Sequence, residues 1–174
     1  MSDMQVPDGD GLKGRVAIVS GGGAAGDGIG NGRAAAILLA RAGCQVCVVD
    51  RLAEAAERTV EMIAEQGGEA IAFAADVSDE DDCRDMVTAT LERFGRLDFL
   101  DNNIGIGSRG SVVEEDPETW RRVMQVNVET MFLAAKYAIP AMIESGGGAI
   151  VNVSSISALR PRGLTAYTVS KGAV

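Results

Sequence analysis

The chain has 174 residues, of which 47% are hydrophobic and 24% are charged, a composition typical of a folded globular domain and unlike that of disordered or fibrous chains. Its formal net charge is −9, which argues against a nucleic-acid partner, because such partners are bound through basic surfaces. The chain contains no histidine. Every mechanism that needs a histidine base, nucleophile or metal ligand is therefore excluded.

The cysteines suggest a metal site only superficially. Cys44 and Cys47 form a CxxC pair, and Cys83 lies further along the chain. A structural zinc site needs four ligands, and this chain offers neither a fourth cysteine nor a histidine. We therefore expect no metal site and interpret the three residues as small buried thiols. Because the chain also lacks a signal peptide or a long apolar run, we expect a cytoplasmic protein without a membrane partner.

Short β-branched segments alternate with longer amphipathic segments. The expected strands lie at residues 16–20, 46–50, 70–74, 97–100 and 149–153, and the expected helices at about 33–42, 52–66, 79–94 and 117–144. Connections this long do not form hairpins, so the strands should be parallel and the crossovers right-handed. The pattern predicts an α/β fold with three layers, in a single domain over residues 1–174 whose first 12 residues are a polar lead-in.

Glycines and one acidic residue mark the ends of these helices. Gly43, the pair Gly67–Gly68 and Gly146 suit C-terminal caps, whereas Asp116 before Pro117 suits an N-cap.

In a parallel sheet of this kind, ligands bind beyond the carboxyl ends of the strands. The residues that follow each strand are therefore the candidates for chemistry.

A glycine-rich loop over residues 21–32 joins the first strand to the first helix. Glycines let the backbone turn tightly and approach a pyrophosphate, whose charge is favoured at a helix N-terminus. Asp50 closes the next strand, 18 residues after Gly32, where a carboxylate would accept hydrogen bonds from an adenosine ribose. Together these features predict a dinucleotide-binding site.

Tyr167 and Lys171 are four residues apart, so they lie on one face of a helix. A phenol in water ionises with a pKa of about 10, and an ammonium about 4 Å away would favour the phenolate by roughly 4 kcal/mol. Such a pair could act as an acid/base near neutral pH, although an exposed pair on a helix surface has the same spacing. Residues 167–174 span only about two helical turns, too short to be stable alone in water.

The ordered set of motifs resembles the short-chain dehydrogenase/reductase family, in its compact, non-extended branch. The matching positions are Ser20-Gly21, Asp50, Asp76-Val77, Asn102-Asn103-Ile104-Gly105, Asn127, Ser154-Ser155 and the YxxxK motif Tyr167–Lys171. The resemblance covers the chain from about residue 12 and implies a Rossmann-type sheet with strand order 3-2-1-4-5. Since the family fold continues beyond Val174, the chain is expected to lack its final strands. The strand at 149–153 would then be an exposed edge.

The resemblance also implies roles for individual residues. Tyr167 would exchange a proton with the substrate oxygen, Lys171 would also bind the nicotinamide ribose, Ser155 would polarise the substrate oxygen, and Asn127 would support a water relay. The family spacing to Tyr167 favours Ser154 instead, but we prefer Ser155 because a loop tolerates a deletion better than a strand register does. The implied cofactor-binding residues are Gly21, Gly30, Asn31, Gly32, Asp50, Asp76, Val77, Asn103, Gly105 and Lys171.

Two departures from the family pattern affect the cofactor site. The glycine loop is longer than usual, and we place its last motif glycines at Gly30 and Gly32, with an insertion after Gly21. The alternative register uses Gly28-Ile29-Gly30. In the fourth-strand motif, Ile104 replaces the usual alanine and Asp101 replaces an apolar residue.

The resemblance implies an NAD(H)-dependent oxidoreductase that transfers hydride between nicotinamide and a secondary alcohol or ketone, with a homo-oligomer for the full family fold. NAD is expected over NADP because Asp50 would repel a 2′-phosphate. Arg51 could hold that phosphate, but strand alternation predicts that it points away. The main alternative is a dinucleotide-binding fragment without turnover. A lyase or epimerase on the same scaffold comes third.

Overall fold

Five parallel strands form one sheet in the computed structural model, which describes residues 11–161 and 163–174. They are β1 (Val16–Ser20), β2 (Gln45–Asp50), β3 (Glu69–Ala74), β4 (Phe99–Asn102) and β5 (Ala149–Asn152). Their order is β3-β2-β1-β4-β5, which confirms the predicted fold class and topology. Residues 1–10 of the predicted polar lead-in lie outside the described residues.

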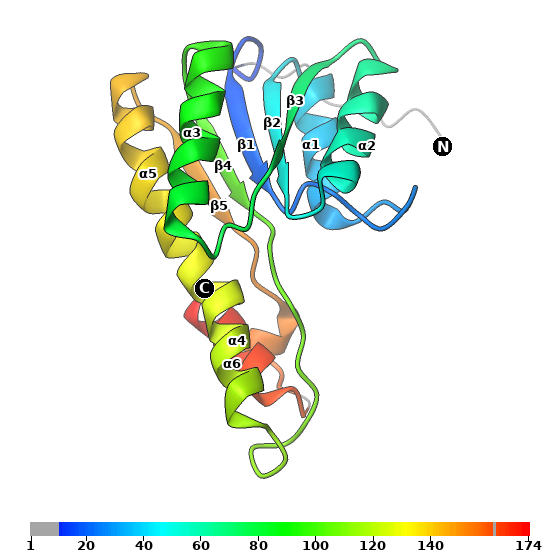
Figure 1. The fold of residues 1–174 in the computed structure, drawn as a ribbon, viewed down its shortest axis with the longest axis vertical. Helices are drawn as coiled ribbons and strands as arrows, with labels where there is room; N and C mark the ends of the chain where they lie inside the picture. Colours follow the sequence, from blue (N-terminus) through cyan, green and yellow to red (C-terminus); the bar gives the residue numbers. More distant parts are fainter. Residues whose placement is uncertain (1–10, 162) are drawn as a thin grey trace.

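Six α-helices accompany the sheet in the described part of the chain. They are α1 (Asn31–Arg41), α2 (Ala53–Ala64), α3 (Glu80–Phe94), α4 (Pro117–Met124), α5 (Thr130–Glu144) and α6 (Thr165–Ala173). Helices α1 and α2 cover one face of the sheet and α3 and α5 cover the other, whereas α4 and α6 extend beyond the carboxyl ends of the strands (Figure 1). This arrangement leaves the carboxyl ends facing α4 and α6.

The predicted helix over 117–144 is not uniform. Between α4 and α5 the chain forms a π-helical segment, Gln125–Glu129, and a short 3-10 helix, Ile156–Ala158, follows β5. A π-helical turn holds one residue more than an α-turn and therefore changes the direction of the side chains within it. Asn127, one of the predicted site residues, lies in this segment.

The hydrophobic core lies on both faces of the central strands. Ile18 and Val49 pack toward α3 and α5, whereas Val19, Val46 and Val48 pack toward α1 and α2. Because side chains alternate between the faces of a strand, a central strand covered on both sides must be apolar throughout. The continuous hydrophobic run in β1 reflects this position.

The three thiols are all buried and free. Burial raises the pKa of Cys44 and Cys47 to about 11 and that of Cys83 to about 12. The thiols are therefore protonated at neutral pH, a state that suits packing rather than nucleophilic chemistry.

None of the helices within residues 11–161 and 163–174 is long and apolar enough to cross a membrane.

The helix ends follow the sequence signals. The side chain of Asp116 accepts hydrogen bonds from the Glu118 and Thr119 amides at the start of α4. Gly43 and Gly146, which follow α1 and α5, have φ values of +92° and +97°, a conformation that favours glycine.

Strand β5 pairs with β4 and forms one edge of the sheet within the described residues. The side of β5 opposite β4 carries no strand there, and Val151 is 57% exposed.

Asp98 ties the start of β1 to the start of β4. Its carboxylate, 2% exposed, accepts hydrogen bonds from Arg15 Nη1 at 2.7 Å, the Val16 amide at 2.9 Å and two guanidinium nitrogens of Arg96 at 2.6 and 2.8 Å. Burial alone would raise the pKa of Asp98, but the bonds from Arg96, Val16 and Arg15 outweigh it and lower the pKa to about 2. Strand β4 begins at Phe99, two residues later than predicted.

Replacing this carboxylate should alter the pH dependence of stability. Because the folded-state pKa lies below the unfolded value, ionised Asp98 stabilises the fold above about pH 4, and this stabilisation is lost as the pH falls toward about 2. We expect Asp98→Asn to lower the free energy of unfolding by about 2 kcal/mol at neutral pH and to flatten its pH dependence in that window. Urea unfolding at several pH values measures both effects. Asp85→Asn, at an exposed site beside Arg84, is the matched control, and an unchanged slope in Asp98→Asn would contradict the assignment.

Candidate active site

Two adjoining cavities lie at the carboxyl ends of the strands, with volumes of about 450 and 340 Å³. Both are lined by Gly21, Asn103 and Gly105, so together they form one extended cleft. Among the predicted site residues, the larger cavity also contains Asp50, Asp76 and Val77, and the smaller also contains Gly30, Asn31, Gly32, Tyr167 and Lys171. The structure thus brings most of the predicted residues to one place.

The glycine loop lets α1 begin directly against the end of β1. A Cβ atom on Gly32 would lie 2.0 Å from the Gly21 carbonyl oxygen, so no larger residue fits there. Gly30 is the N-cap of α1 and lines the smaller cavity, whereas Gly28 does not. Gly32 is therefore the glycine of this loop at which helix α1 lies closest to the end of β1. The preferred register takes the same residue as the last glycine of the motif.

Asp50 lies where the glycine loop meets the start of α2. Its Oδ2 accepts a hydrogen bond from the Gly23 amide at 3.1 Å, and its Oδ1 accepts one from the Leu52 amide at 3.0 Å. A Cβ atom on Gly23 would lie 2.6 Å from Asp50 Oδ2. The loop can therefore contact the carboxylate only because residue 23 is a glycine.

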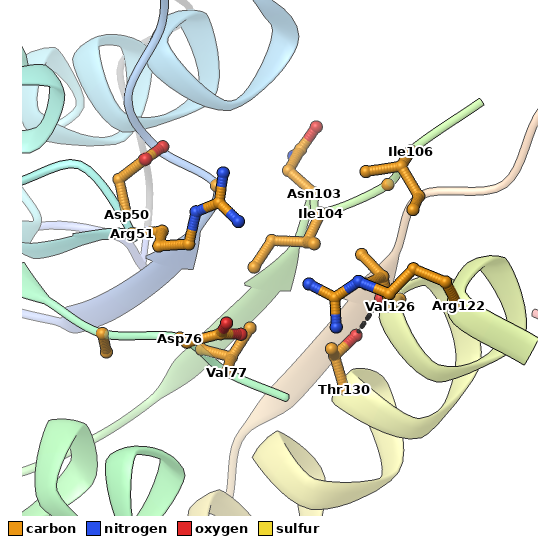
Figure 2. A pocket seen from close by; sticks show the side chains of 13 residues that line it. Asp50, Arg51, Asp76, Val77, Asn103, Ile104, Ile106, Arg122, Val126 and Thr130 are labelled. Carbon is orange, nitrogen blue, oxygen red and sulfur yellow. Dashed lines mark hydrogen bonds between the residues drawn. The ribbon is translucent and has the colours of Figure 1, made fainter. Parts of the chain in front are cut away.

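Two arginines line the larger cavity beside the acidic residues (Figure 2). Arg51 was predicted to point away from Asp50, and this is wrong: both residues line the cavity. The reason is that β2 ends at Asp50, so strand alternation no longer governs the next residue. Arg122 reaches the cavity from α4 and was not predicted. The only sequence signal for Arg122 was its spacing of four residues to Val126 and of eight to Thr130, which line the same cavity.

Asp76 is held by the residue two positions later. The Ser78 hydroxyl donates to Asp76 Oδ1 at 2.6 Å, and the Ser78 amide donates to the same atom at 3.0 Å. These two bonds lower the pKa of Asp76, and the charges of Arg122 and Arg51 lower it further. Asp76 therefore presents an ionised carboxylate to the cavity at neutral pH.

The unusual Asp101 orients Asn103. Asn103 Nδ2 donates to both carboxylate oxygens of Asp101 at 2.9 Å. Burial raises the pKa of Asp101, and the hydrogen bond from Asn103 opposes this by favouring the ionised form. The departure from the family pattern at residue 101 thus fixes a side chain at the junction of the two cavities.

Asn127 lies behind the cleft and outside the lining of both cavities. Its Oδ1 accepts from the Ile106 amide at 2.8 Å, and its Nδ2 donates to the Ile106 carbonyl at 3.0 Å and to Ser170 Oγ at 2.9 Å. This buried amide therefore joins the loop after β4 to helix α6. Asn127 makes these contacts from within the π-helical segment.

Lys171 is 4% exposed and extends from α6 toward the end of β5. Its Nζ donates to the Val153 carbonyl at 2.6 Å, and burial lowers the pKa of Lys171. A Cβ atom on Gly105 would lie 3.1 Å from Lys171 Nζ and 3.6 Å from Asn127 Oδ1. Gly105 thus leaves room for the ammonium in the same cavity that Tyr167 lines.

The two candidate serines occupy different positions. Ser154 lines the smaller cavity, and its Oγ donates to the Lys171 carbonyl at 2.6 Å. Ser155, the preferred candidate, lies outside that lining, and its Oγ accepts from the Ser157 amide at 3.2 Å at the start of the 3-10 helix. The choice between them remains a prediction.

Helix α6 begins on groups from a distant loop. Its N-cap residue, Leu164, makes no side-chain cap bond. Instead, Glu115 Oε2 accepts from the Ala166 amide at 3.0 Å, and Ser108 Oγ accepts from the Tyr167 amide at 3.1 Å and donates to Glu115 Oε2 at 3.0 Å. A carboxylate at a helix N-terminus is also favoured by the helix dipole. Sequence reasoning missed both residues because neither is near α6 in the chain.

The chain matches the family model described as short chain dehydrogenase over residues 15–174. It is 42% identical over 165 residues to an uncharacterized oxidoreductase of Thermotoga maritima, an alignment that covers 94% of this chain and 62% of the relative. It is 40% identical over 146 residues to the cyclohexanol dehydrogenase of an Acinetobacter strain, covering 83% of this chain and 56% of the relative.

Solved structures of dehydrogenases have the same fold. An NAD⁺-bound xylitol dehydrogenase has a TM-score of 0.87 and 33% identity, with 94% of this chain and 62% of that chain covered. A 7α-hydroxysteroid dehydrogenase complexed with NADH and 7-oxo glycochenodeoxycholic acid has a TM-score of 0.87 and 32% identity, with 95% and 63% covered.

The chain thus spans 56–63% of the lengths of these four relatives. The family match extends over almost the whole chain, and the sheet has the order that the motifs imply. This protein belongs to the short-chain dehydrogenase/reductase family.

Proposed function

We propose that this chain binds NAD(H) in the extended cleft and interconverts a secondary alcohol and the corresponding ketone. The observation that carries the proposal is the presence of Tyr167 and the buried Lys171 in the same cavity as the glycine loop. The names of two relatives, a cyclohexanol dehydrogenase and an NAD⁺-bound xylitol dehydrogenase, support this class of substrate and cofactor.

The cleft has features that fit a dinucleotide. Gly32 and Gly21 leave a backbone cradle that a Cβ atom would fill, and the N-terminus of α1 favours a pyrophosphate there. Asp50, Asp76 and Val77 would hold the adenosine half, and Asn103, Gly105 and Lys171 the nicotinamide half. When bound, the nicotinamide would accept or supply the hydride.

The proton would move through the hydroxyl of Tyr167. In reduction the Tyr167 hydroxyl would donate its proton to the ketone oxygen, and in oxidation the phenolate oxygen would accept the proton of the alcohol. Lys171 would stabilise the phenolate, because attraction between opposite charges is stronger in a partly buried site than in water. The Val153 carbonyl holds the ammonium in place, and Asn127 would position α6 through Ser170.

A second candidate is binding of the dinucleotide without turnover. One observation favours it: the alignment covers 62% of the length of the Thermotoga relative, and turnover requires a positioned substrate in addition to a bound dinucleotide. Binding and turnover must therefore be measured separately.

Tyr167→Phe tests the acid/base assignment. The change keeps the ring and removes only the hydroxyl, so we expect hydride transfer to fall by at least about 100-fold while NAD⁺ affinity stays within about twofold. The assay follows nicotinamide absorbance with cyclohexanol and xylitol as substrates, beside calorimetric NAD⁺ binding.

Tyr137→Phe is the matched control, because this tyrosine lies on α5 and donates to Glu80 outside the cleft. Turnover close to wild type in Tyr167→Phe would refute the assignment. NAD⁺ binding without turnover in the wild type would support the second candidate.

Asp50 should make the site prefer NAD⁺ over NADP⁺. The Asp50 carboxylate would repel the 2′-phosphate of NADP⁺ by a few kcal/mol at an effective dielectric near 20. Arg51, which lines the same cavity, would offset part of this repulsion. We expect NAD⁺ to bind at least about tenfold more tightly, Asp50→Ser to narrow the difference and Arg51→Gln to widen it. Calorimetric titration of all three proteins with both nucleotides measures the ratios. Equal affinities in the wild type would contradict the prediction.

A further inference from the structure

Arg122 is a charged residue of the larger cavity that the proposed chemistry does not use. It is an exposed residue in the last turn of α4, and its side chain points into the cavity (Figure 2). Its Nη1 donates to Gln125 Oε1 at 3.1 Å, which holds the guanidinium beside its own helix. A guanidinium has five N–H donors, and no other acceptor among the described residues is bonded to this one. Donors of Arg122 are therefore available to a ligand in the cavity.

The charged groups that line the larger cavity balance one another. Two carboxylates, Asp50 and Asp76, accompany two guanidinium groups, Arg51 and Arg122, so their formal charges cancel. Both arginines are close enough to Asp76 for their charges to lower its pKa. Neither arginine forms an ion pair with a carboxylate among residues 11–161 and 163–174. A lining with this balance favours a neutral ligand that carries both donors and acceptors over a free anion.

Asp76 and Arg122 offer complementary polar groups to such a ligand. The ionised carboxylate of Asp76 can only accept hydrogen bonds, whereas the guanidinium of Arg122 can only donate them. The two side chains enter the same cavity from different elements, the segment after β3 and helix α4 (Figure 2). Other parts of the lining are apolar and include Val77, Ile104 and Val126. A flat apolar ring with a donor beside an acceptor on its edge fits this combination.

Adenine is a ring of this kind. Its 6-amino group is a donor, and a ring nitrogen acceptor lies on each side of it, N1 and N7. The carboxamides of asparagine and glutamine bind the 6-amino group and N7 of adenine because they offer one acceptor and one donor side by side. Arginine alone pairs with guanine, whose O6 and N7 both accept. A carboxylate beside the guanidinium therefore changes the preferred base, and Asp76 gives Arg122 such a neighbour.

We infer that Arg122 is a base-recognition residue of the cleft: its guanidinium donates to N1 or N7 of the adenine ring while Asp76 accepts from the 6-amino group. The inference rests on the proposed function, in which the larger cavity holds the adenosine half of NAD(H). It adds helix α4 to the elements that bind the dinucleotide, and it gives the cleft a means of selecting adenine over other bases.

The test compares AMP with its 1-deaza and 7-deaza analogues, each of which lacks one of the two ring acceptors beside the amino group. Calorimetric titration of the full chain should show that one of the two analogues binds at least about fivefold more weakly than AMP. In Arg122→Met, which removes the donors, AMP should lose about that factor while the same analogue loses less than about twofold. Because the comparison is between two ligands on one variant, a general loss of affinity cannot imitate this result.

Arg121→Met is the matched control, because Arg121 is the adjacent exposed arginine on α4 and does not line the larger cavity. It should keep the wild-type preference for AMP over the weaker analogue. The inference would be overturned if the wild type bound AMP and both analogues equally, or if the preference persisted in Arg122→Met and disappeared in Arg51→Met. Failure of the wild type to bind both AMP and NAD⁺ would instead contradict the proposed function.

Discussion

Parallel pairing of β1 with β2 on one side and β4 on the other is the interaction on which the rest of the site depends. Because the strands run in one direction, the residues that follow them meet at a single edge of the sheet. Each of five groups lies at or just after the carboxyl end of a different strand: the glycine loop, Asp50, Asp76, Asn103 and Ser154. Backbone hydrogen bonding, rather than attraction among these side chains, therefore assembles a cleft from five distant parts of the chain.

The features that sequence analysis predicted correctly have local causes. The run at 16–20 is apolar because β1 is covered on both faces, and the start of α4 is signalled by Asp116 and Pro117 within a few residues. The register that makes Gly32 the last motif glycine rests on local counting too, from its distance along the helix to Gly43, and it stays a prediction. Signals of this kind need no knowledge of what lies across the fold.

The features that it missed depend on partners far away in the chain. A charged residue such as Arg33 is expected on a helix surface, and only the path of the loop and the position of Thr59 make its burial possible. Ser108 and Glu115 bind amides more than 50 residues away. Arg51 was misplaced because a periodic rule was extended one residue beyond the end of its strand.

The caps of α6 come from a different part of the chain from the helix itself. A nine-residue helix has little stability alone, so the segment that carries Tyr167 and Lys171 can persist only once the loop after β4 has closed over it. Closing such a long loop has an entropic cost that short-range contacts avoid. Tyr167 and Lys171 are therefore expected to become ordered late in folding, and this corner can open locally while the central strands stay paired.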